Sequence, residues 1–315
     1  QLSGITGKLR NRISKKRIIV LCADNGVVEE GVSCTPQTVT ASQAVNMTKH
    51  LTGMSSMAKH FGCEVEVVDV GICTPYDCPL ILNRRIKNGT ENLYKEPAMT
   101  RQEALDAIGA GIERAIAAGE DEVSVIGVGE MGIGNTTTSS AVLSVLTGLN
   151  AEQVTGRGGG LTDQDFQKKK DVIDGAIALH KPKPDDPVDV LSKVGGLDLA
   201  AMCGVFLGAA YKRIPVVIDG FISVVAALCA ARLCPEVKDF LFPSHASKEL
   251  GYQLAMNELG MNPYLLLNMR LGEGSGCPLA FEILDAACAL MNGMATFDGA
   301  GINDEYLTEI RKQEF

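Results

Sequence analysis

The sequence predicts an α/β fold, a three-layer arrangement in which helices cover both faces of a mostly parallel, Rossmann-like sheet. Short apolar, β-branched segments alternate along the 315 residues with longer segments of helical periodicity, the order that βαβ units produce. Several short segments end in glycine or acidic turn residues, and parallel sheets bind ligands at the edge where their strands end. The expected strands are residues 17–23, 64–70, 123–126, 215–218 and 239–242.

Helices are expected between these strands. A capping box, Thr100 with Glu103, precedes the helix expected at residues 101–118. Turn residues interrupt the pattern twice: residues 74–95 are expected to form a surface excursion, and 180–187, with three prolines, a break. The other expected helices are residues 40–61, 138–146, 164–179, 197–211, 221–233, 248–259 and 279–291, with an extended segment at 264–269.

The composition limits the classes of partner. The chain has a formal net charge of −9 at pH 7 and a pI near 5.1, which argues against nucleic acid or an anionic membrane as the main partner. Its longest apolar runs, residues 199–211 and 220–231, are too short to cross a bilayer. Ten scattered cysteines without a C-x-x-C pair, and only four histidines, predict free thiols in a reducing cytoplasm and no metal site.

The chain is organised around residues 127–137, Gly-Val-Gly-Glu-Met-Gly-Ile-Gly-Asn-Thr-Thr. This segment follows an expected strand and opens an expected helix, so backbone N–H groups and the helix dipole favour an anion above the turn. A tight turn without a ligand explains the glycines equally well. Gly127, Gly129 and Gly132 also satisfy the dinucleotide fingerprint G-x-G-x-x-G. However, Glu130 would face the pyrophosphate, and no strand ending in an acid follows at the expected distance.

Two glutamates in glycine turns, Glu130 and Glu273, carry the strongest chemical signal. Each precedes an expected helix. One is a candidate general base, and the other is a candidate partner for a ring nitrogen or for water. The alternative is that each carboxylate only caps its helix N-terminus. A base at a helix N-terminus needs apolar surroundings to keep its proton affinity.

Other polar residues have competing interpretations. Arg157, in a glycine-rich loop, and one of residues 168–170 are candidates for contact with a phosphate, although three consecutive lysines most often form a solvated helix face. Asp24 and Asp219 follow strands, where an aspartate often only closes a turn. His245 is a candidate acid–base group, but a single histidine after a strand is more often structural.

These motifs together resemble one family, the nicotinate-nucleotide:dimethylbenzimidazole phosphoribosyltransferases of cobamide lower-ligand synthesis. The resemblance covers nearly the whole chain. Its most specific motifs are residues 129–137 and the run Arg-Leu-Gly-Glu-Gly-Ser-Gly at 270–276. The other matching motifs are residues 23–27, 30–33 with Pro36, 156–158, 193–196, 215–221 and 244–245.

The resemblance implies transfer of ribose 5-phosphate from nicotinate mononucleotide to an aromatic base, with inversion of C1′ from β to α and without a cofactor or metal. Nicotinate leaves as an uncharged ring nitrogen and needs no general acid, whereas the incoming azole must lose a proton. The family's base is the glutamate of the 270–276 motif, here Glu273. A phenol can lose its proton there as an azole does, so benzimidazole, purine and phenol all stay open as acceptors.

The resemblance also implies roles for other residues. Glu130 would support the acceptor ring or the charge that develops at the ribose. The implied substrate contacts are Ser33, Pro36 and Gln37 around the acceptor, Gly132, Gly134, Asn135 and Thr136 around the nucleotide, Gly158, Gly159 and Lys169 around its phosphate, and in addition Asp219 and Leu271.

The sequence departs from the family pattern in three places. Asn25 stands where the family usually has histidine, and Gly159 replaces a threonine, which alters the expected grip on the phosphate. The family's Lys-Pro-x-Gly-Ser-Leu-Gly segment is not found. We therefore expect a large domain at residues 17–276 and a small helical subdomain at 1–16 and 277–315 that is incomplete or is completed by a partner chain.

The expected partners are the small-molecule substrates and a second chain, identical or homologous, because the family is dimeric and has some heterodimeric members. Two other functions stay open. One is a ligand-binding, weakly catalytic subunit of a heterodimer, against which the presence of both Glu130 and Glu273 argues. The other is an NAD-dependent dehydrogenase that uses Gly127, Gly129 and Gly132.

Overall fold

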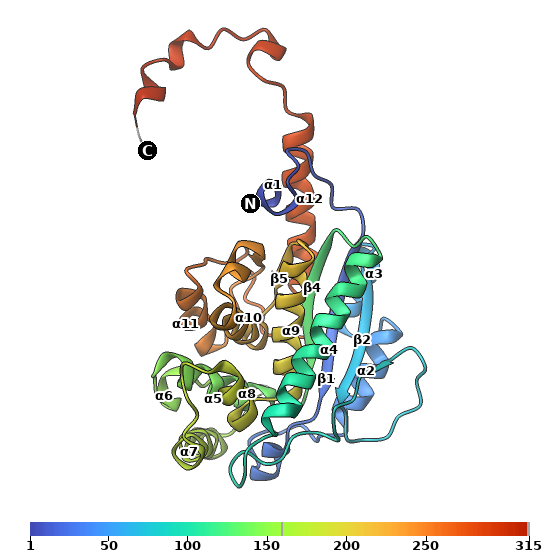
Figure 1. Ribbon diagram of the computed structural model, residues 1–315, viewed down its shortest axis with the longest axis vertical. Coiled ribbons are helices and arrows are strands. Elements are labelled where there is room, and N and C mark those ends of the chain that lie inside the picture. Colours follow the sequence, from blue (N-terminus) through green and yellow to red (C-terminus); the bar gives the residue numbers. More distant parts are fainter. Residues whose placement is uncertain (159, 314–315) are drawn as a thin grey trace.

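The computed structural model describes residues 1–158 and 160–313, and in these residues it contains one six-stranded sheet. The strands are β1 (Lys16–Ala23), β2 (Glu64–Gly71), β3 (Leu82–Asn83), β4 (Val125–Met131), β5 (Val216–Ile218) and β6 (Leu241–Pro243). Every strand pair is parallel, and the order β3-β2-β1-β4-β5-β6 is that of a doubly wound Rossmann sheet. The predicted fold class is confirmed (Figure 1).

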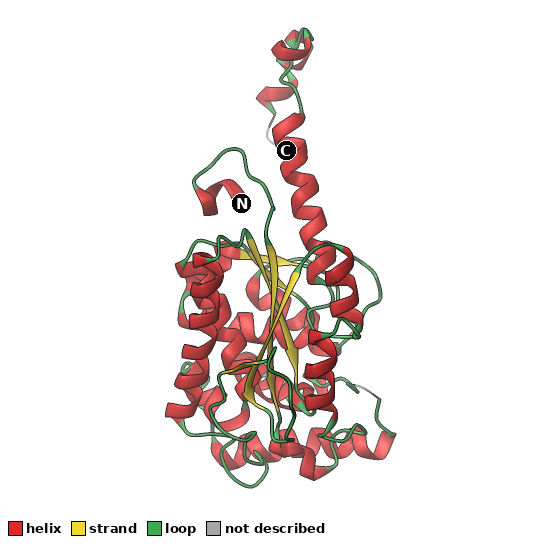
Figure 2. Cartoon of the chain, turned by 90° about the vertical axis from the view of Figure 1, so that its right-hand side faces the viewer, coloured by secondary structure: helices red, strands yellow, loops and turns green. Residues whose placement is uncertain are grey.

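Helices cover both faces of the sheet, which Figure 2 shows nearly edge-on. The α-helices of the described residues are α1 (Leu2–Thr6), α2 (Val39–Thr48), α3 (Gly53–His60), α4 (Arg101–Glu120), α5 (Asn135–Thr147), α6 (Ala151–Val154), α7 (Asp163–His180), α8 (Pro187–Val194), α9 (Leu197–Tyr211), α10 (Phe221–Leu233), α11 (Leu250–Leu259) and α12 (Cys277–Gly293). Short 3-10 helices lie at Gly26–Glu30, Pro235–Phe240, Asp298–Ala300, Glu305–Leu307 and Ile310–Lys312.

The two layers of helices bury two apolar clusters against the sheet. On one face α9 contacts β1, β2, β4 and β5, and α4 packs on α9. On the other face α2 and α3 contact β2, and α12 contacts β4 and β5. Because both faces are covered, the central strands β1 and β4 are buried almost throughout, which explains why they read as continuous apolar runs in the sequence.

The single helix predicted at residues 40–61 is wrong, because the chain forms two helices there, α2 and α3. His50, just after α2, has a left-handed backbone with φ of 58°, which a continuing helix does not allow. Thr52 then starts α3 through a capping box with Ser55, whose backbone N–H donates to the Thr52 hydroxyl at 3.3 Å.

The strand predicted at residues 123–126 is longer than expected, because β4 continues to Met131 and contains Gly127 and Gly129. A Cβ atom at Gly127 would collide with the Cys277 side chain, and one at Gly129 with the Glu273 carbonyl. These glycines therefore allow the start of α12 and the preceding turn to approach the strand closely. They do not form the phosphate loop that a dinucleotide fingerprint requires.

Two further segments differ from the prediction. After the break at residues 180–187 the chain forms α8, in which Pro187 occupies the first turn and the Asp186 carboxylate accepts from the Asp189 N–H at 3.1 Å. The extended segment at 264–269 forms no strand. It lies beside the chain that follows β6, with a bridge between His245 and Leu265 and a further backbone hydrogen bond from Lys248 to Met269.

The N-terminal segment and α12 lie at the edge of the sheet where the strands begin, opposite the edge where the strands end (Figure 1). The first turns of α12 are anchored in the core by Cys277 and Phe281, and its far end holds the N-terminal segment through a hydrogen bond of 2.8 Å from the Asn292 amide to the Asn11 carbonyl. The division into a large domain at 17–276 and a small subdomain from the chain ends stays a proposal.

Among the described residues, no helix is long and apolar enough to span a membrane.

Gly129→Ala is predicted to lower the free energy of unfolding by about 1–3 kcal/mol, because its new methyl group collides with the Glu273 carbonyl, a backbone atom that cannot rotate away. The matched control is Gly109→Ala on the exposed side of α4, where the methyl group meets open space. That change is expected to stabilise the protein by about 0.5–1 kcal/mol. Urea unfolding of the two variants measures the change in the free energy of unfolding and its sign. Equal changes in both variants would contradict the packing argument.

Candidate active site

A cavity of about 300 Å³ lies where β4 and β5 end, beside the turn that precedes α12. It sits beside the point between β1 and β4 at which the strand order reverses, where doubly wound sheets bind ligands. Its volume is at the lower end of the range for small-molecule sites. Predicted site residues that line it are Ser33, Glu130, Gly132, Gly134, Asn135, Thr136, Gly158, Asp219, Leu271 and Glu273.

Three predicted residues, Pro36, Gln37 and Lys169, have other positions. Pro36 is exposed at the entrance to α2, and the Gln37 amide donates to the Asn25 carbonyl at 3.3 Å, so both lie beside the cavity rather than in its lining. Lys169 lines a smaller cavity of about 30 Å³ that shares Gly134, Thr136 and Gly158 with the larger one. Gly159 lies outside the described residues.

Glu273 occupies a turn with an unusual backbone. Gly272, Glu273 and Gly274 all have positive φ values, of 78°, 65° and 91°. For glutamate this conformation is strained, and strain of this kind persists only where surrounding contacts hold it. Those contacts come from two carboxylates. Glu130 Oε1 accepts from the Glu273 N–H at 3.1 Å, and Asp219 accepts from the Gly274 and Gly276 N–H groups at 2.9 and 2.6 Å.

The Glu273 side chain itself is weakly held. The residue is 7% exposed, and its Oε1 lies 3.5 Å from the Gln43 amide nitrogen. Its other oxygen, Oε2, is buried and accepts no hydrogen bond from the described residues. Burial raises the pKa of Glu273, against the opposing effects of Thr52, the Met54 backbone and Gln43. A buried carboxylate oxygen with increased proton affinity, lining a cavity, has the properties of a general base.

Glu130, in contrast, has both oxygens engaged. Oε2 accepts from the Asn135 amide at 2.5 Å, and the same amide nitrogen donates to Asp198 Oδ2 at 3.0 Å. Burial raises the pKa of Glu130 to about 8 and that of Asp198 to about 6. The two glutamates in glycine turns are therefore adjacent but have different roles. Glu130 holds the backbone of Glu273, and Glu273 keeps a free oxygen.

Asp219 and His245 form a buried cluster behind the turn. Both Asp219 oxygens hold turn N–H groups, and burial raises the pKa of this carboxyl to about 7. The His245 ring Nδ1 lies 3.2 Å from the Ser244 hydroxyl and 3.8 Å from Asp219, and burial lowers its pKa. His245 does not line the cavity, which fits the structural interpretation of this histidine.

Lys169 and Lys170 are buried, so the alternative interpretation of residues 168–170 as a solvated helix face does not hold for these two lysines. The cause is tertiary, because α7 packs against α5. The Lys169 ammonium donates to the Thr136 hydroxyl at 2.8 Å and to the Gly156 carbonyl at 3.3 Å, and burial lowers its pKa to about 8. A partly desolvated cation beside a helix N-terminus is a place for an anion.

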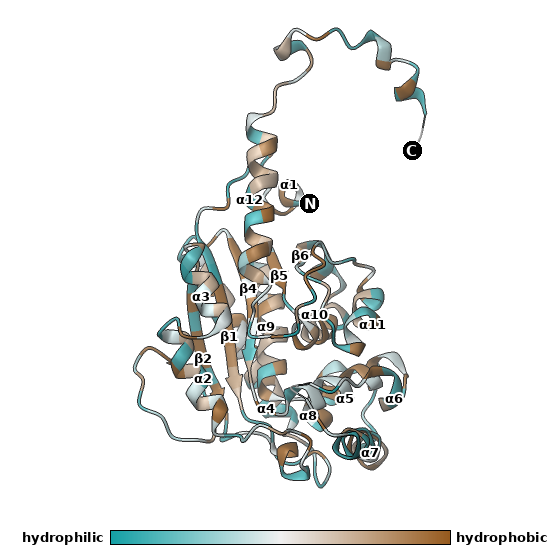
Figure 3. Ribbon diagram, turned by 180° about the vertical axis from the view of Figure 1, so that it is seen from behind, coloured by the Kyte–Doolittle hydropathy of each residue, from teal (hydrophilic) through white to brown (hydrophobic). Residues whose placement is uncertain are grey.

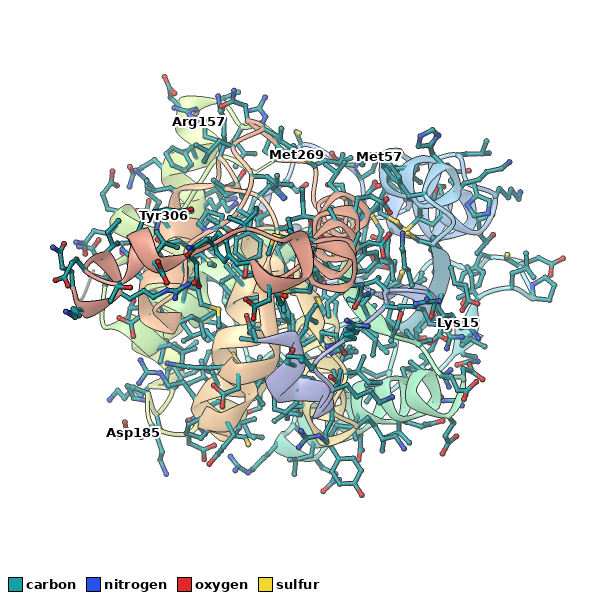
Figure 4. The ribbon with its side chains drawn as sticks, turned by 90° about the horizontal axis from the view of Figure 1, so that it is seen from above. Lys15, Met57, Arg157, Asp185, Met269 and Tyr306 are labelled. Atoms are coloured by element: carbon teal, nitrogen blue, oxygen red, sulfur yellow. The ribbon has the colours of Figure 1, made fainter. Side chains whose placement is uncertain are left out.

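Arg157, the other candidate for phosphate contact, lines the smaller cavity but is otherwise committed. Its guanidinium pairs with Asp163 at 2.5 Å and lies 4.7 Å above the Phe166 ring. Figure 4 places it at the periphery of the molecule. Of the two candidates, Lys169 is the better placed for a bound anion.

Several site residues were missed in the sequence. Gln43, from α2, and Thr52, at the start of α3, approach Glu273, and Asp198 reaches Glu130 through Asn135. Asp198 had a usable signal, because it is the only charged residue of the apolar helix α9. Gln43 and Thr52 had none, since nothing local shows which strand end a helix will face.

Glu130→Gln is predicted to reduce the pH dependence of stability in the ligand-free protein. A folded-state pKa near 8, above the ordinary value of 4.5, means that stability is lost as pH rises from about 4.5 through 8. The glutamine variant lacks this loss, so its urea midpoint should fall less than that of the wild type between pH 5.5 and 8.5. Glu113→Gln is the control, because Arg84 lowers the pKa of that carboxyl. Equal slopes in Glu130→Gln and wild type would show that Glu130 does not titrate in this range.

The sequence matches a known protein family and several named relatives. Residues 1–302 match the family described as "Phosphoribosyltransferase". The nicotinate-nucleotide–dimethylbenzimidazole phosphoribosyltransferase of Clostridium perfringens is 54% identical over 314 residues, which are 100% of this chain and 87% of that protein. The protein of the same name from Ruminiclostridium cellulolyticum is 52% identical over 302 residues, 96% of this chain and 86% of that one.

Solved structures show the same relationship. The crystal structure of CobT from Thermus thermophilus superposes with a TM-score of 0.92 at 37% identity, covering 96% of this chain and 91% of that chain. The match therefore extends over nearly the whole chain. This chain belongs to the phosphoribosyltransferase family that the relatives named nicotinate-nucleotide–dimethylbenzimidazole phosphoribosyltransferase represent.

Proposed function

We propose that this protein transfers ribose 5-phosphate from nicotinate mononucleotide to 5,6-dimethylbenzimidazole or a related base, releasing nicotinate and giving an α-riboside 5-phosphate for cobamide synthesis. The observation that carries the proposal is the buried, unpartnered Oε2 of Glu273 in a cavity at the strand ends. The names of relatives up to 54% identical over the full chain support this choice of substrates.

The reaction needs one proton acceptor. As the C1′–N bond of the donor breaks, its electron pair returns to the pyridinium ring, and nicotinate leaves with a neutral ring nitrogen. One nitrogen of the benzimidazole forms the new bond to C1′ from the opposite face, which inverts that carbon. The N–H proton of the other ring nitrogen passes to Glu273, whose raised pKa suits it to hold the proton.

Glu130 contributes through position and charge. It fixes the strained turn by accepting from the Glu273 N–H, and it lines the cavity in which the reacting atoms meet. In the ionised form its carboxylate stabilises positive charge that develops at the ribose as nicotinate departs. Asn135 and Asp198 hold it in place.

The phosphate of the donor is assigned to the smaller cavity. Lys169 and Thr136 meet there at 2.8 Å beside the N-terminus of α5, and Gly158 has positive φ and leaves room for an anion. Binding a dianion in this place also stabilises the charged form of Lys169, whose pKa burial lowers.

The acceptor pocket is assigned to the part of the cavity around Glu273. Leu271 and Val39 provide apolar contacts for a flat ring, and Ser33, Thr35 and Gln43 provide a few polar groups. A pocket that combines apolar contacts with a few polar groups and one free carboxylate suits an azole or a phenol. We take benzimidazole as the preferred class because the relatives carry that name.

A weakly catalytic, ligand-binding subunit is less well supported, because both glutamates are present and Glu273 is arranged as a base.

We also propose a second chain, identical or homologous, as partner. Support comes from exposed apolar side chains along α12 and the C-terminal segment, including Leu290, Met294 and Tyr306. The ribbon of α12 carries hydrophobic positions along its length in Figure 3. A cytoplasmic location is proposed from the ten free cysteines.

Glu273→Gln is predicted to reduce kcat by about 10²–10⁴-fold, since the side chain keeps its size but cannot take the azole proton. The KM for nicotinate mononucleotide should change little. Chromatography of nicotinate released in the presence of dimethylbenzimidazole measures both. The control is Glu282→Gln on α12, a carboxylate that pairs with Lys16 away from the cavity. A Glu273→Gln enzyme as fast as wild type would remove Glu273 as the base.

A further inference from the structure

One carboxylate in the cavity has no role in the mechanism above. Glu249 lines the cavity from the start of α11, where it occupies the N-cap position. Its side chain makes no capping hydrogen bond, although glutamate is not among the residues that favour this position. A residue that breaks a local preference without a local contact points to a role outside its own helix.

The surroundings of Glu249 are built around its carboxylate. Oε2 is buried and accepts no hydrogen bond from the described residues. A Cβ atom at Gly156 would collide with this oxygen, so glycine at position 156 leaves the space that the carboxylate fills. The carbonyl of the same Gly156 accepts from the Lys169 ammonium. Glu249 therefore lies on the side of the larger cavity that is next to Lys169.

The four carboxylates that line the cavity divide into two pairs. Glu130 and Asp219 have both oxygens engaged by protein donors. Glu273 and Glu249 each keep a buried oxygen without a partner in the described part of the chain. An unpartnered buried acceptor is costly, and a bound ligand that donates to it recovers that cost.

The donors that a nucleotide brings are few. The phosphate, the nicotinate ring and its carboxylate only accept hydrogen bonds at neutral pH, and the acceptor base gives its proton to Glu273. The remaining donors are the 2′- and 3′-hydroxyl groups of the ribose, which lies between the phosphate and the reacting C1′. The carboxylate of Glu249 can accept hydrogen bonds from these hydroxyl groups, and it lies near Lys169, where the phosphate is assigned.

We propose that Glu249 binds the ribose hydroxyls of the donor nucleotide and makes the enzyme select a ribonucleotide over a deoxyribonucleotide. This inference rests on nicotinate mononucleotide as the proposed donor. The contact holds the sugar by one edge while the phosphate is held at Lys169, so C1′ is presented to the acceptor in a fixed orientation.

The test compares binding of nicotinate mononucleotide with binding of its 2′-deoxy and 3′-deoxy analogues by calorimetry without an acceptor. Wild type should bind at least one deoxy analogue about 10–100-fold more weakly, the value of a hydrogen bond to a charged group. Glu249→Ala should discriminate by less than about 3-fold, because the partner of the hydroxyl is already absent. Glu249→Gln, which keeps an acceptor oxygen, should lie between the two.

Glu258→Gln is the control, since Glu258 lies on the same helix but pairs with Arg232 at the surface. It should discriminate as wild type does. Undiminished discrimination in Glu249→Ala, with the variant folded by thermal denaturation, overturns the assignment of Glu249. Wild type that binds and discriminates but transfers nothing to dimethylbenzimidazole contradicts the proposed acceptor and leaves the role of Glu249 intact. Wild type that fails to bind nicotinate mononucleotide overturns both.

Discussion

The site depends on hydrogen bonds from the backbone of one turn, residues 273–276, to two buried carboxylates. Glu130, in β4, and Asp219, just after β5, accept three backbone N–H groups of residues 273–276. These contacts hold Glu273 at a φ that glutamate avoids and direct its side chain to the cavity. Because the holding carboxylates belong to adjacent strands of a rigid sheet, the position of the base is fixed by the fold rather than by the turn.

Burial of this many carboxylates is energetically expensive, and the protein limits the cost in two ways. Backbone and amide donors engage Glu130, Asp198 and Asp219 almost completely, and burial raises the pKa of each, so part of the population is protonated near neutral pH. Among the described residues, Glu273 and Glu249, which line the cavity, each keep a buried oxygen without a partner, as Asp24 does after β1. At Glu273 and Glu249, stability is thus given up where a ligand can restore it.

The glycines of this chain serve packing as much as ligand binding. Gly127 and Gly129 allow the start of α12 and the Glu273 turn to lie against β4, whereas Gly158 borders the smaller cavity. The same residue type therefore has two functions, close packing inside the strand and the lining of a cavity outside it. This distinction explains why a match to a dinucleotide fingerprint carries little weight by itself.

The sequence by itself determined the alternating α/β order, the approximate strand positions and the two glutamates in glycine turns, because backbone period and turn chemistry are local properties. It did not determine that Lys169 is buried, that Asp198 reaches Glu130 through Asn135, or that Gln43 and Glu249 border the cavity. Those facts depend on which helices pack together and which strand ends they face. Burial and partner are properties of the assembled layers, so only the tertiary structure decides them.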